Sequence, residues 1–418
     1  MMTIRRAITR TVCGAVLLTG SAVACKDSFL QVTNPNLIDA ATVDPNSGAG
    51  TLAASAQQNF ATAIGWLIMY GSWFTGEANV SDTFPTRNEF GFRTISDLNG
   101  SLNTDVWQPL SLAAASSKIV LDLDLPNPTT NINLARGATF RGFSVLQMAT
   151  DFCTGTLSSG PELTTAQMLD TAIFWFSKGV DVGNANGSAD GKNLANASLV
   201  GRARAKLQKG DKAGAKADAD AVTAGFSLNL TFTDDLSNRT RLSNRLWSFT
   251  FDRGSISVPT FYQTTDPRVP FKAPGTHTLQ PQDAVPGGYF IQQKYPAYAS
   301  PVRLASKLEA DYISAEASGD PTQQLTLINA RRAANSLPAY SGASDAASVM
   351  TELYTQRAFE FYMEGKRIAD YRRSPASTMG IAATGSVYVK PGYANVGSQT
   401  CYPIPRAERD NNPNMKTP

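Results

Sequence analysis

The fold is decided by the stretch RAFEFYMEGKRIADYRR, residues 357–373, near the C-terminus of the chain. From Ala346 to Tyr371 apolar residues recur at helical spacing, which predicts one long helix. These apolar residues are Met350, Leu353, Tyr354, Phe361 and Ile368. Gly365 lies inside the predicted helix at a cost of about 1 kcal/mol relative to alanine, which indicates close packing at that position. Pro375 follows and fits the end of the helix.

Four charged residues of this stretch lie three or four positions apart. They are Arg357, Glu360, Glu364 and Arg367. On one helix they would share a face and pair in alternating sign. A catalytic role for the two glutamates is the weaker alternative, since each has an arginine neighbour that keeps it ionised. We therefore interpret the four residues as a structural signature.

Working outward, helical periods run along most of the chain. Helices are predicted over 50–74, 105–121, 133–152, 165–180, 197–209, 211–224, 303–317, 321–334 and 344–373, with a loop over 190–195. The pair 197–209 and 211–224 has alanines on both helices and a short turn, which is typical of a tetratricopeptide-like unit. The sequence predicts a mainly α fold, with a helical scaffold over about 50–224 and 301–373.

The helical period disappears over about 225–300. Residues 226–232 alternate between apolar and polar and predict a short strand. The rest is rich in proline, glycine, threonine and aromatic residues, and long loops of this kind are usually functional. A tail follows over 374–418.

The N-terminus has the pattern of a secretory signal. Arginines at its start are followed by a short apolar run over 12–20 and small residues up to Ala24. Cys25 then stands where a bacterial lipoprotein is acylated, although Ala22 occupies a position where leucine is usual. We predict a lipoprotein signal peptide over 1–24, lipid attachment at Cys25, and membrane association by this anchor only. The alternative is an ordinary signal peptide cut after Ala24, with Cys25 unmodified.

Charge excludes one class of partner. The chain of 418 residues has a formal net charge of +3, and residues 1–24 contain three arginines and no acidic residue, so their removal lowers the charge to 0. A near-neutral chain gives no electrostatic footprint for nucleic acid.

Two cysteines remain outside the predicted signal and anchor, Cys153 and Cys401. Outside the cytoplasm two thiols can form a disulfide. The sequence does not tell whether they are close in space, so a disulfide and two separate thiols both remain open.

No catalytic constellation is recognisable. There is no phosphate-binding glycine loop and no dinucleotide fingerprint. The single histidine, His277, excludes most histidine-dependent triads and zinc sites. The adjacent acids Asp234 and Asp235 fit a solvated loop or a set of calcium ligands better than a glycosidase pair. We predict that the chain is not an enzyme and has no cofactor or metal site.

The stretch 357–373, together with YPIPRAERDNNPN at 402–414, resembles the C-terminal signature of the SusD/RagB family. Segments 303–312 and 328–333 also resemble helices of that family. These are lipid-anchored nutrient-binding proteins of the bacterial outer membrane. The resemblance implies a single SusD-like domain over 25–418, with a tetratricopeptide-like scaffold and a loop-rich ligand-binding region. It also implies that Pro403 and Pro405 belong to a segment that packs the tail on the helical body.

The resemblance further implies a function. The protein would face the cell exterior, bind an oligosaccharide and deliver it to a TonB-dependent outer-membrane channel. Glycan binding requires exposed aromatic rings, because sugar rings lay their apolar faces on them. The candidates in loops are Trp73, Phe84, Tyr262, Tyr289, Tyr295 and Tyr298. The alternative for each ring is that it closes the core under a loop, and Trp66 is assigned to the core by its helical position.

Two other functions remain open from the sequence. The same scaffold can bind peptides or another polymer for uptake, which a groove with few exposed aromatic rings would favour. A secreted glycoside hydrolase is the third alternative, and it requires two carboxylates at glycosidase separation.

Overall fold

The computed structural model describes residues 44–415, and helices form most of this part of the chain. The mainly helical fold is therefore confirmed. The predictions for the signal peptide and for Cys25 lie outside the described residues. Within residues 44–415, no helix is both long enough and apolar enough to cross a membrane.

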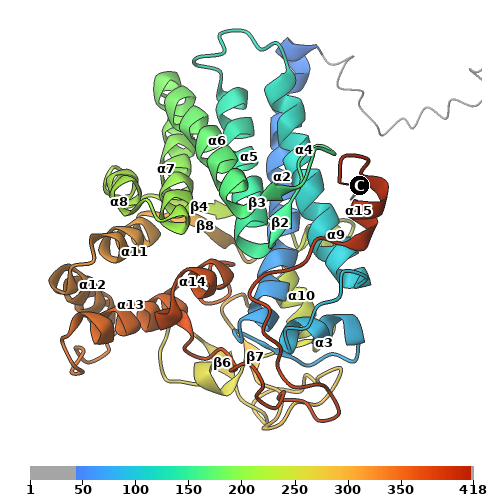
Figure 1. Ribbon diagram of the computed structural model, residues 1–418, viewed down its shortest axis with the longest axis vertical. Helices are drawn as coiled ribbons and strands as arrows, with labels where there is room; N and C mark the ends of the chain where they lie inside the picture. The colour runs from blue at the N-terminus through green and yellow to red at the C-terminus, as the bar shows by residue number, and fades with distance from the viewer. Residues whose placement is uncertain (1–43, 416–418) are drawn as a thin grey trace, which may run out of the picture. The chain divides into compact units, whose positions relative to one another are not determined.

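The first half of the described chain is a row of helices, each packed on the next in sequence (Figure 1). The helices are α2 (Pro45–Phe74), α4 (Gln108–Asp122), α5 (Ile132–Asp151), α6 (Thr165–Asn186), α7 (Ala189–Lys209) and α8 (Lys212–Asp220). This arrangement is typical of helical repeats, in which each unit buries its apolar face on its neighbours.

Glycines let α5, α6 and α7 approach one another closely. The ring of Phe176 on α6 lies over Gly142 of α5 and Gly201 of α7. A Cβ atom at Gly142 would lie 2.6 Å from that ring, and one at Gly201 would lie 2.3 Å from it. Any larger side chain at either position would therefore push the helices apart.

The predicted loop over 190–195 is wrong, because these residues belong to α7. The helix begins earlier, since the Ser188 side chain caps it by accepting a hydrogen bond from the Gly191 N–H at 3.1 Å. At its other end, Gly210 adopts a left-handed conformation and Asp211 caps α8. The short turn between the predicted helix pair is thus present, and α7 packs on α8.

The second half contains α11 (Lys307–Ser318), α12 (Pro321–Ala334), α13 (Ala346–Glu360) and α14 (Arg367–Arg373). The predicted helix over 303–317 starts too early. Its first residues form strand β8 (Val302–Ser306), which pairs antiparallel with β4 (Ser227–Leu230), the short strand expected in this region. Apolar side chains of β8 are buried, and Ser306 then caps α11. Helix α11 also packs on α8 and so joins the two halves.

The single long helix predicted up to Tyr371 is wrong. A turn over 361–366 separates α13 from α14, and Gly365 lies in this turn with φ +69°. That conformation favours glycine, and a Cβ atom there would lie 3.0 Å from the Ile68 side chain. Close packing at Gly365 is therefore present, but the glycine ends a turn and does not interrupt a helix.

The turn also rearranges the four charged residues of the signature, which do not pair with one another. Arg357 pairs with Asp370 at 2.7 Å, and Glu360 pairs with Arg331 at 3.2 Å. Arg367 donates to the carbonyl oxygen of Met379. All four are buried.

A buried carboxylic acid holds this turn to α2. Glu77, just after α2, accepts a hydrogen bond from the Met363 N–H at 2.9 Å. Burial raises the pKa of Glu77 to about 7, well above its ordinary value near 4.5. The folded state therefore binds this proton more tightly than the unfolded state does.

Glu77→Gln is expected to stabilise the protein at pH 8 by up to about 3 kcal/mol and to be nearly neutral at pH 4. In the wild type, the raised pKa means that stability is lost as pH rises from about 4.5 to about 7. Glutamine keeps an acceptor oxygen for Met363 but carries no charge. Urea unfolding of both proteins at pH 4, 6 and 8 measures the difference. A difference that is constant over this range would show that Glu77 is not protonated in the fold.

The loop-rich region contains short elements, and α10 (Arg245–Phe251) among them packs on α2, as does α3 (Pro85–Gly91). The short elements are α9 (Arg239–Leu242), α10, β5 (Ile256–Ser257), η4 (Thr260–Tyr262), β6 (Phe271–Lys272) and β7 (Ile291–Gln292). Strand β5 pairs with β1 (Asn79–Val80), and β6 pairs with β7. Helix α10 has no counterpart among the predicted helices, because its seven residues are too few to show a period. Asn244 starts it by accepting from the Trp247 N–H at 3.2 Å.

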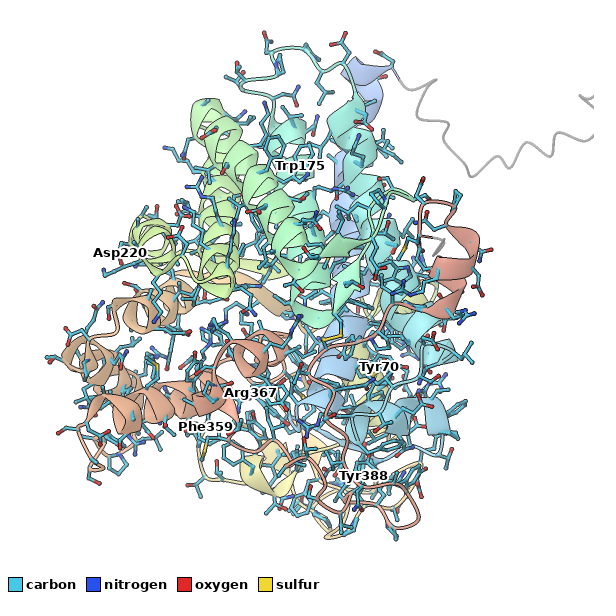
Figure 2. All side chains as sticks on the ribbon, viewed as in Figure 1. Tyr70, Trp175, Asp220, Phe359, Arg367 and Tyr388 are labelled. Atoms are coloured by element: carbon cyan, nitrogen blue, oxygen red, sulfur yellow. A yellow bond between two sulfur atoms is a disulfide. The ribbon has the colours of Figure 1, made fainter. Side chains whose placement is uncertain are left out.

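The C-terminal tail is fixed to the end of α5. Cys153 and Cys401 form a disulfide, so of the two open alternatives the structure has the paired one (Figure 2). Next to it, the Tyr402 N–H donates to the carbonyl oxygen of Asp151 at 2.7 Å, and the Cys153 N–H donates to that of Tyr402 at 2.9 Å. Tyr402 is fully buried, and Pro405 precedes the short helix α15 (Arg406–Asn411).

Candidate functional site

A cavity of about 540 Å³ lies where α2, α3, α9 and α10 meet the π-helical turn η3 (Leu102–Trp107). We call it the α2–α10 cleft. Its lining residues are Trp66, Arg87, Asp105, Arg239, Thr240, Ser243, Arg245, Ser248, Phe249, Asp252 and Arg253. The set combines two aromatic rings with many charged and hydroxyl groups, which is the composition of a site for a polar ligand.

Helix α10 forms one wall of the cleft. Arg245, Ser248 and Phe249 are three or four residues apart, so they share one face of α10. The guanidinium group of Arg245 lies over the Trp66 ring of α2, 4.5 Å from its centroid. Gly65 makes this approach possible, since a Cβ atom there would lie 3.2 Å from Arg245 Cγ. Phe249 meets Trp66 edge to face at 5.3 Å.

Arg87 of α3 forms the inner end of the cleft. Its guanidinium pairs with Asp82 at 2.5 Å and lies over the ring of Phe84 at 4.5 Å and that of Phe249 at 5.1 Å. Burial by itself lowers the pKa of Arg87, but Tyr70 and Asp82 outweigh it, and the pKa is raised above its ordinary value. Arg87 therefore stays charged at the base of the cleft.

Asp105, also in the lining, accepts a hydrogen bond from the Tyr70 hydroxyl at 2.6 Å. Burial of Tyr70 and the charge of Asp105 both raise the pKa of that hydroxyl. Tyr70 is labelled on α2 in Figure 2. The π-helical turn that carries Asp105 is an irregularity that occurs frequently at functional sites.

Aromatic rings outside the cavity adjoin its rim. Trp247 and Phe251 of α10 stack at 5.0 Å with planes 18° apart, and Phe251 is 45% exposed. The Tyr298 ring meets both of them edge on and donates its hydroxyl to Asp252 of the rim. Burial and the hydrogen bond to Asp252 raise the pKa of Tyr298 to about 12. The guanidinium group of Arg239 lies over the Tyr298 ring, 4.3 Å from its centroid. We call Trp247, Phe251 and Tyr298 the aromatic rim.

Three buried polar atoms of the lining have no hydrogen-bond partner among residues 44–415. They are Ser243 Oγ, Arg87 Nε and Arg245 Nε. Buried polar groups are normally hydrogen-bonded, so their accumulation at one cavity favours a ligand or solvent that supplies partners.

Of the six aromatic residues predicted to bind a ligand, two adjoin the α2–α10 cleft. Phe84 is 47% exposed beside Arg87, and Tyr298 belongs to the aromatic rim. These two stay candidates.

The other four predictions are corrected, because their side chains are buried. Trp73, Tyr262, Tyr289 and Tyr295 are each at most 5% exposed and cannot present a ring face to a sugar. Trp73 lies in α2 and not in a loop, and the segments that carry the three tyrosines lie directly on the core. The Tyr295 hydroxyl donates to the carbonyl oxygen of Met363 at 2.9 Å, and that of Tyr289 donates to Thr250 at 2.7 Å.

The sequence did not identify several residues of the site. Trp66 was assigned to the core, but it is only partly buried and lines the cleft, because the short α10 covers it incompletely. Trp247 and Phe251 lie in the unrecognised helix α10. The sequence does contain a signal for this site, because arginines at 239, 241, 245 and 253 lie close to Trp247 and Phe251. In the described part of the chain, no cluster of three or more histidine, cysteine, aspartate or glutamate side chains is arranged to hold a metal ion.

No family model matches the sequence, and no curated protein matches it as a relative. Solved structures do match. A SusD superfamily protein from Parabacteroides distasonis has a TM-score of 0.64 at 15% identity, with 89% of this chain and 98% of that chain covered. A SusD/RagB family protein from Bacteroides thetaiotaomicron has a TM-score of 0.64 at 13% identity, with 88% and 95% covered.

A third structure is described as a SusD-like carbohydrate-binding protein from Bacteroides vulgatus. It has a TM-score of 0.61 at 15% identity, with 79% of this chain and 84% of that chain covered. These matches cover between 79% and 89% of this chain. The resemblance of the C-terminal motifs is thus confirmed at the level of the fold: the chain has the fold of the SusD superfamily.

Proposed function

We propose that this protein binds an oligosaccharide in the α2–α10 cleft and on the aromatic rim. The observation that carries this proposal is the stack of half-buried Trp247 and exposed Phe251 next to a cavity rich in hydrogen-bonding groups. A sugar ring has an apolar face that an exposed aromatic ring covers, and hydroxyl groups that polar side chains bind. The rim and the cleft supply these two kinds of contact side by side.

The fold supports the same proposal. One solved structure with this fold is described as carbohydrate-binding, and the match to it covers 79% of this chain. The carboxylates of the cleft, Asp105 and Asp252, each accept a hydrogen bond from a tyrosine hydroxyl. They serve the architecture of the cleft, and a binding function accounts for them without a reaction.

We further propose that the protein delivers its ligand to a TonB-dependent outer-membrane channel and is anchored beside it by a lipid on Cys25. The supports are the signal pattern before Cys25 and the resemblance of segments 357–373 and 402–414 to the SusD/RagB signature. Purification from native outer membranes in mild detergent tests this step. Recovery of a large β-barrel channel with the protein is expected, and recovery of the protein alone under crosslinking would contradict it.

Phe251→Ala is expected to weaken oligosaccharide binding about tenfold, which corresponds to about 1.4 kcal/mol. Phe251 is exposed, so its truncation removes a ring face without opening the core. A glycan array identifies the ligands, and calorimetry of wild type and variant then measures affinity. Phe174→Ala is the matched control, because Phe174 is an exposed aromatic residue on α6 that does not line the cleft. Equal affinity of Phe251→Ala and wild type, or binding of peptides and no glycan, would contradict the proposal.

A further inference from the structure

The α2–α10 cleft is rich in guanidinium groups. Its lining includes Arg87, Arg239, Arg245 and Arg253, against two acidic residues, Asp105 and Asp252. Asp82 lies behind the lining and offsets Arg87, with which it pairs at 2.5 Å. The cleft therefore has an excess of positive charge in a chain whose overall net charge is only +3.

Three of these arginines lack a direct salt bridge in the described part of the chain. Among residues 44–415, Arg239, Arg245 and Arg253 form no ion pair. Burial lowers the pKa of Arg245, although the charge of Asp105 acts on this arginine and partly offsets the lowering. Arg245 donates only to the carbonyl oxygen of Arg241, at 3.5 Å, and its buried Nε has no partner. The two aspartates of the cleft are hydrogen-bonded to the hydroxyls of Tyr70 and Tyr298.

Arginines in the helical core have protein partners, and several of these partners are carboxylates. Arg202 pairs with Asp218 at 2.7 Å, Arg204 with Glu309 at 2.8 Å, and Arg373 with Glu316 at 2.7 Å. Buried Arg141 and Arg367 instead donate to the carbonyl oxygens of Ala114 and Met379. Among the described residues, the guanidinium groups of Arg239 and Arg253 have neither kind of partner, and Arg253 is exposed.

The unpaired guanidinium groups are also held in place. Arg245 lies over Trp66 at 4.5 Å, Arg239 over Tyr298 at 4.3 Å, and Arg253 over Phe249 at 5.2 Å. Stacking fixes the plane of a guanidinium group and leaves its N–H edge available. An N–H edge of this kind binds the two oxygens of a carboxylate or sulfate with two parallel hydrogen bonds.

From this geometry we infer that the ligand of the cleft is an anionic oligosaccharide, whose carboxylate or sulfate groups bind Arg239, Arg245 and Arg253. The inference rests on the proposed function and adds the chemical class of the glycan. The sugar rings would contact the aromatic rim while the acidic groups enter the cleft. Ser243, buried and with its hydroxyl unpartnered among the described residues, offers a further donor to such a group.

Two pairs of glycans test the inference. The members of each pair share the same sugar backbone, and only one member carries acidic groups. Oligogalacturonate is compared with its methyl ester, and dextran sulfate with dextran, by calorimetry in 0.05 M and 0.3 M salt. We expect one acidic glycan to bind at least tenfold more tightly than its neutral partner. Its binding should be weaker in 0.3 M than in 0.05 M salt. The first pair reports a carboxylate ligand and the second a sulfate ligand.

Variants separate the cleft from general charge attraction. Arg253→Gln and Arg239→Gln are each expected to weaken acidic-glycan binding three- to tenfold. Arg241→Gln is the matched control, because Arg241 is an exposed arginine of the same segment that does not line the cleft. Circular dichroism melts verify that each variant is folded.

Two results would overturn the inference in distinguishable ways. Neutral glycans that bind as tightly as acidic ones, with no effect of Arg253→Gln, would overturn it and leave the proposed function intact. Binding of no glycan from the array or from either pair would overturn the proposed function as well. An equal loss in Arg241→Gln and Arg253→Gln would also contradict the inference, because the attraction would then not be located in the cleft.

Discussion

Glu364→Ala is expected to lower the free energy of unfolding by about 3–5 kcal/mol. The side chain of Glu364 is 2% exposed and pairs with three cations: Lys294 at 2.8 Å, Arg303 at 2.9 Å and Lys366 at 3.0 Å. Its removal leaves these positive charges close together, and Lys366 is itself buried. An uncompensated buried charge costs far more than the loss of one hydrogen bond.

The pH dependence of this effect has a definite sign. Burial by itself raises the pKa of Glu364, but Lys294, Lys366 and Arg303 outweigh it and hold the pKa below its ordinary value. The stabilisation is therefore fully present above the unfolded pKa of about 4.3 and is lost as pH falls toward the folded pKa. The difference between wild type and variant should shrink in strong acid.

Chemical denaturation at pH 7 and at pH 3 measures both effects. Asp122→Ala is the control, since the pair of Asp122 with Lys118 is exposed and should contribute less than about 1 kcal/mol. If Glu364→Ala costs no more than Asp122→Ala, the charged signature of residues 357–373 does not stabilise the fold.

Replacing both cysteines, as Cys153→Ser with Cys401→Ser, is expected to lower the free energy of unfolding by about 2–5 kcal/mol. The disulfide joins residues 248 positions apart, so its main effect is to restrict the unfolded chain. It also fixes the tail, where Tyr402 is buried against the end of α5.

Urea unfolding with and without a thiol reductant tests this prediction on the wild type. Cys153 is exposed, so the reductant reaches the bond. The reductant should lower the midpoint of the wild type and leave that of the double serine variant unchanged. Equal midpoints for the wild type in both conditions would show that the crosslink does not contribute.

The helical scaffold could be predicted from the sequence because its helices are long. Over 15 to 30 residues, as in α2 and α5, the apolar period outweighs local irregularities. Errors arose where one or two residues decide the outcome. Gly365 ends a turn where the apolar period predicts an unbroken helix, and Ser188 starts α7 just before the predicted loop over 190–195.

The site was less predictable, because aromatic residues in loops serve both core and surface. Tyr289 and Tyr298 have similar sequence surroundings, yet one is buried and the other belongs to the rim. Only tertiary packing separates them. Likewise, the helical period assigns Trp66 to the core. Trp66 is only partly buried because the helix that packs against it, α10, is short.

The most direct test of the proposed function is a crystal structure of the protein with the tightest oligosaccharide found on the array. We expect sugar rings against Phe251 and Tyr298, with polar or acidic groups in the α2–α10 cleft within hydrogen-bonding distance of Arg245. An oligosaccharide bound on another face of the molecule, with none of its groups in the cleft, would contradict the proposed function.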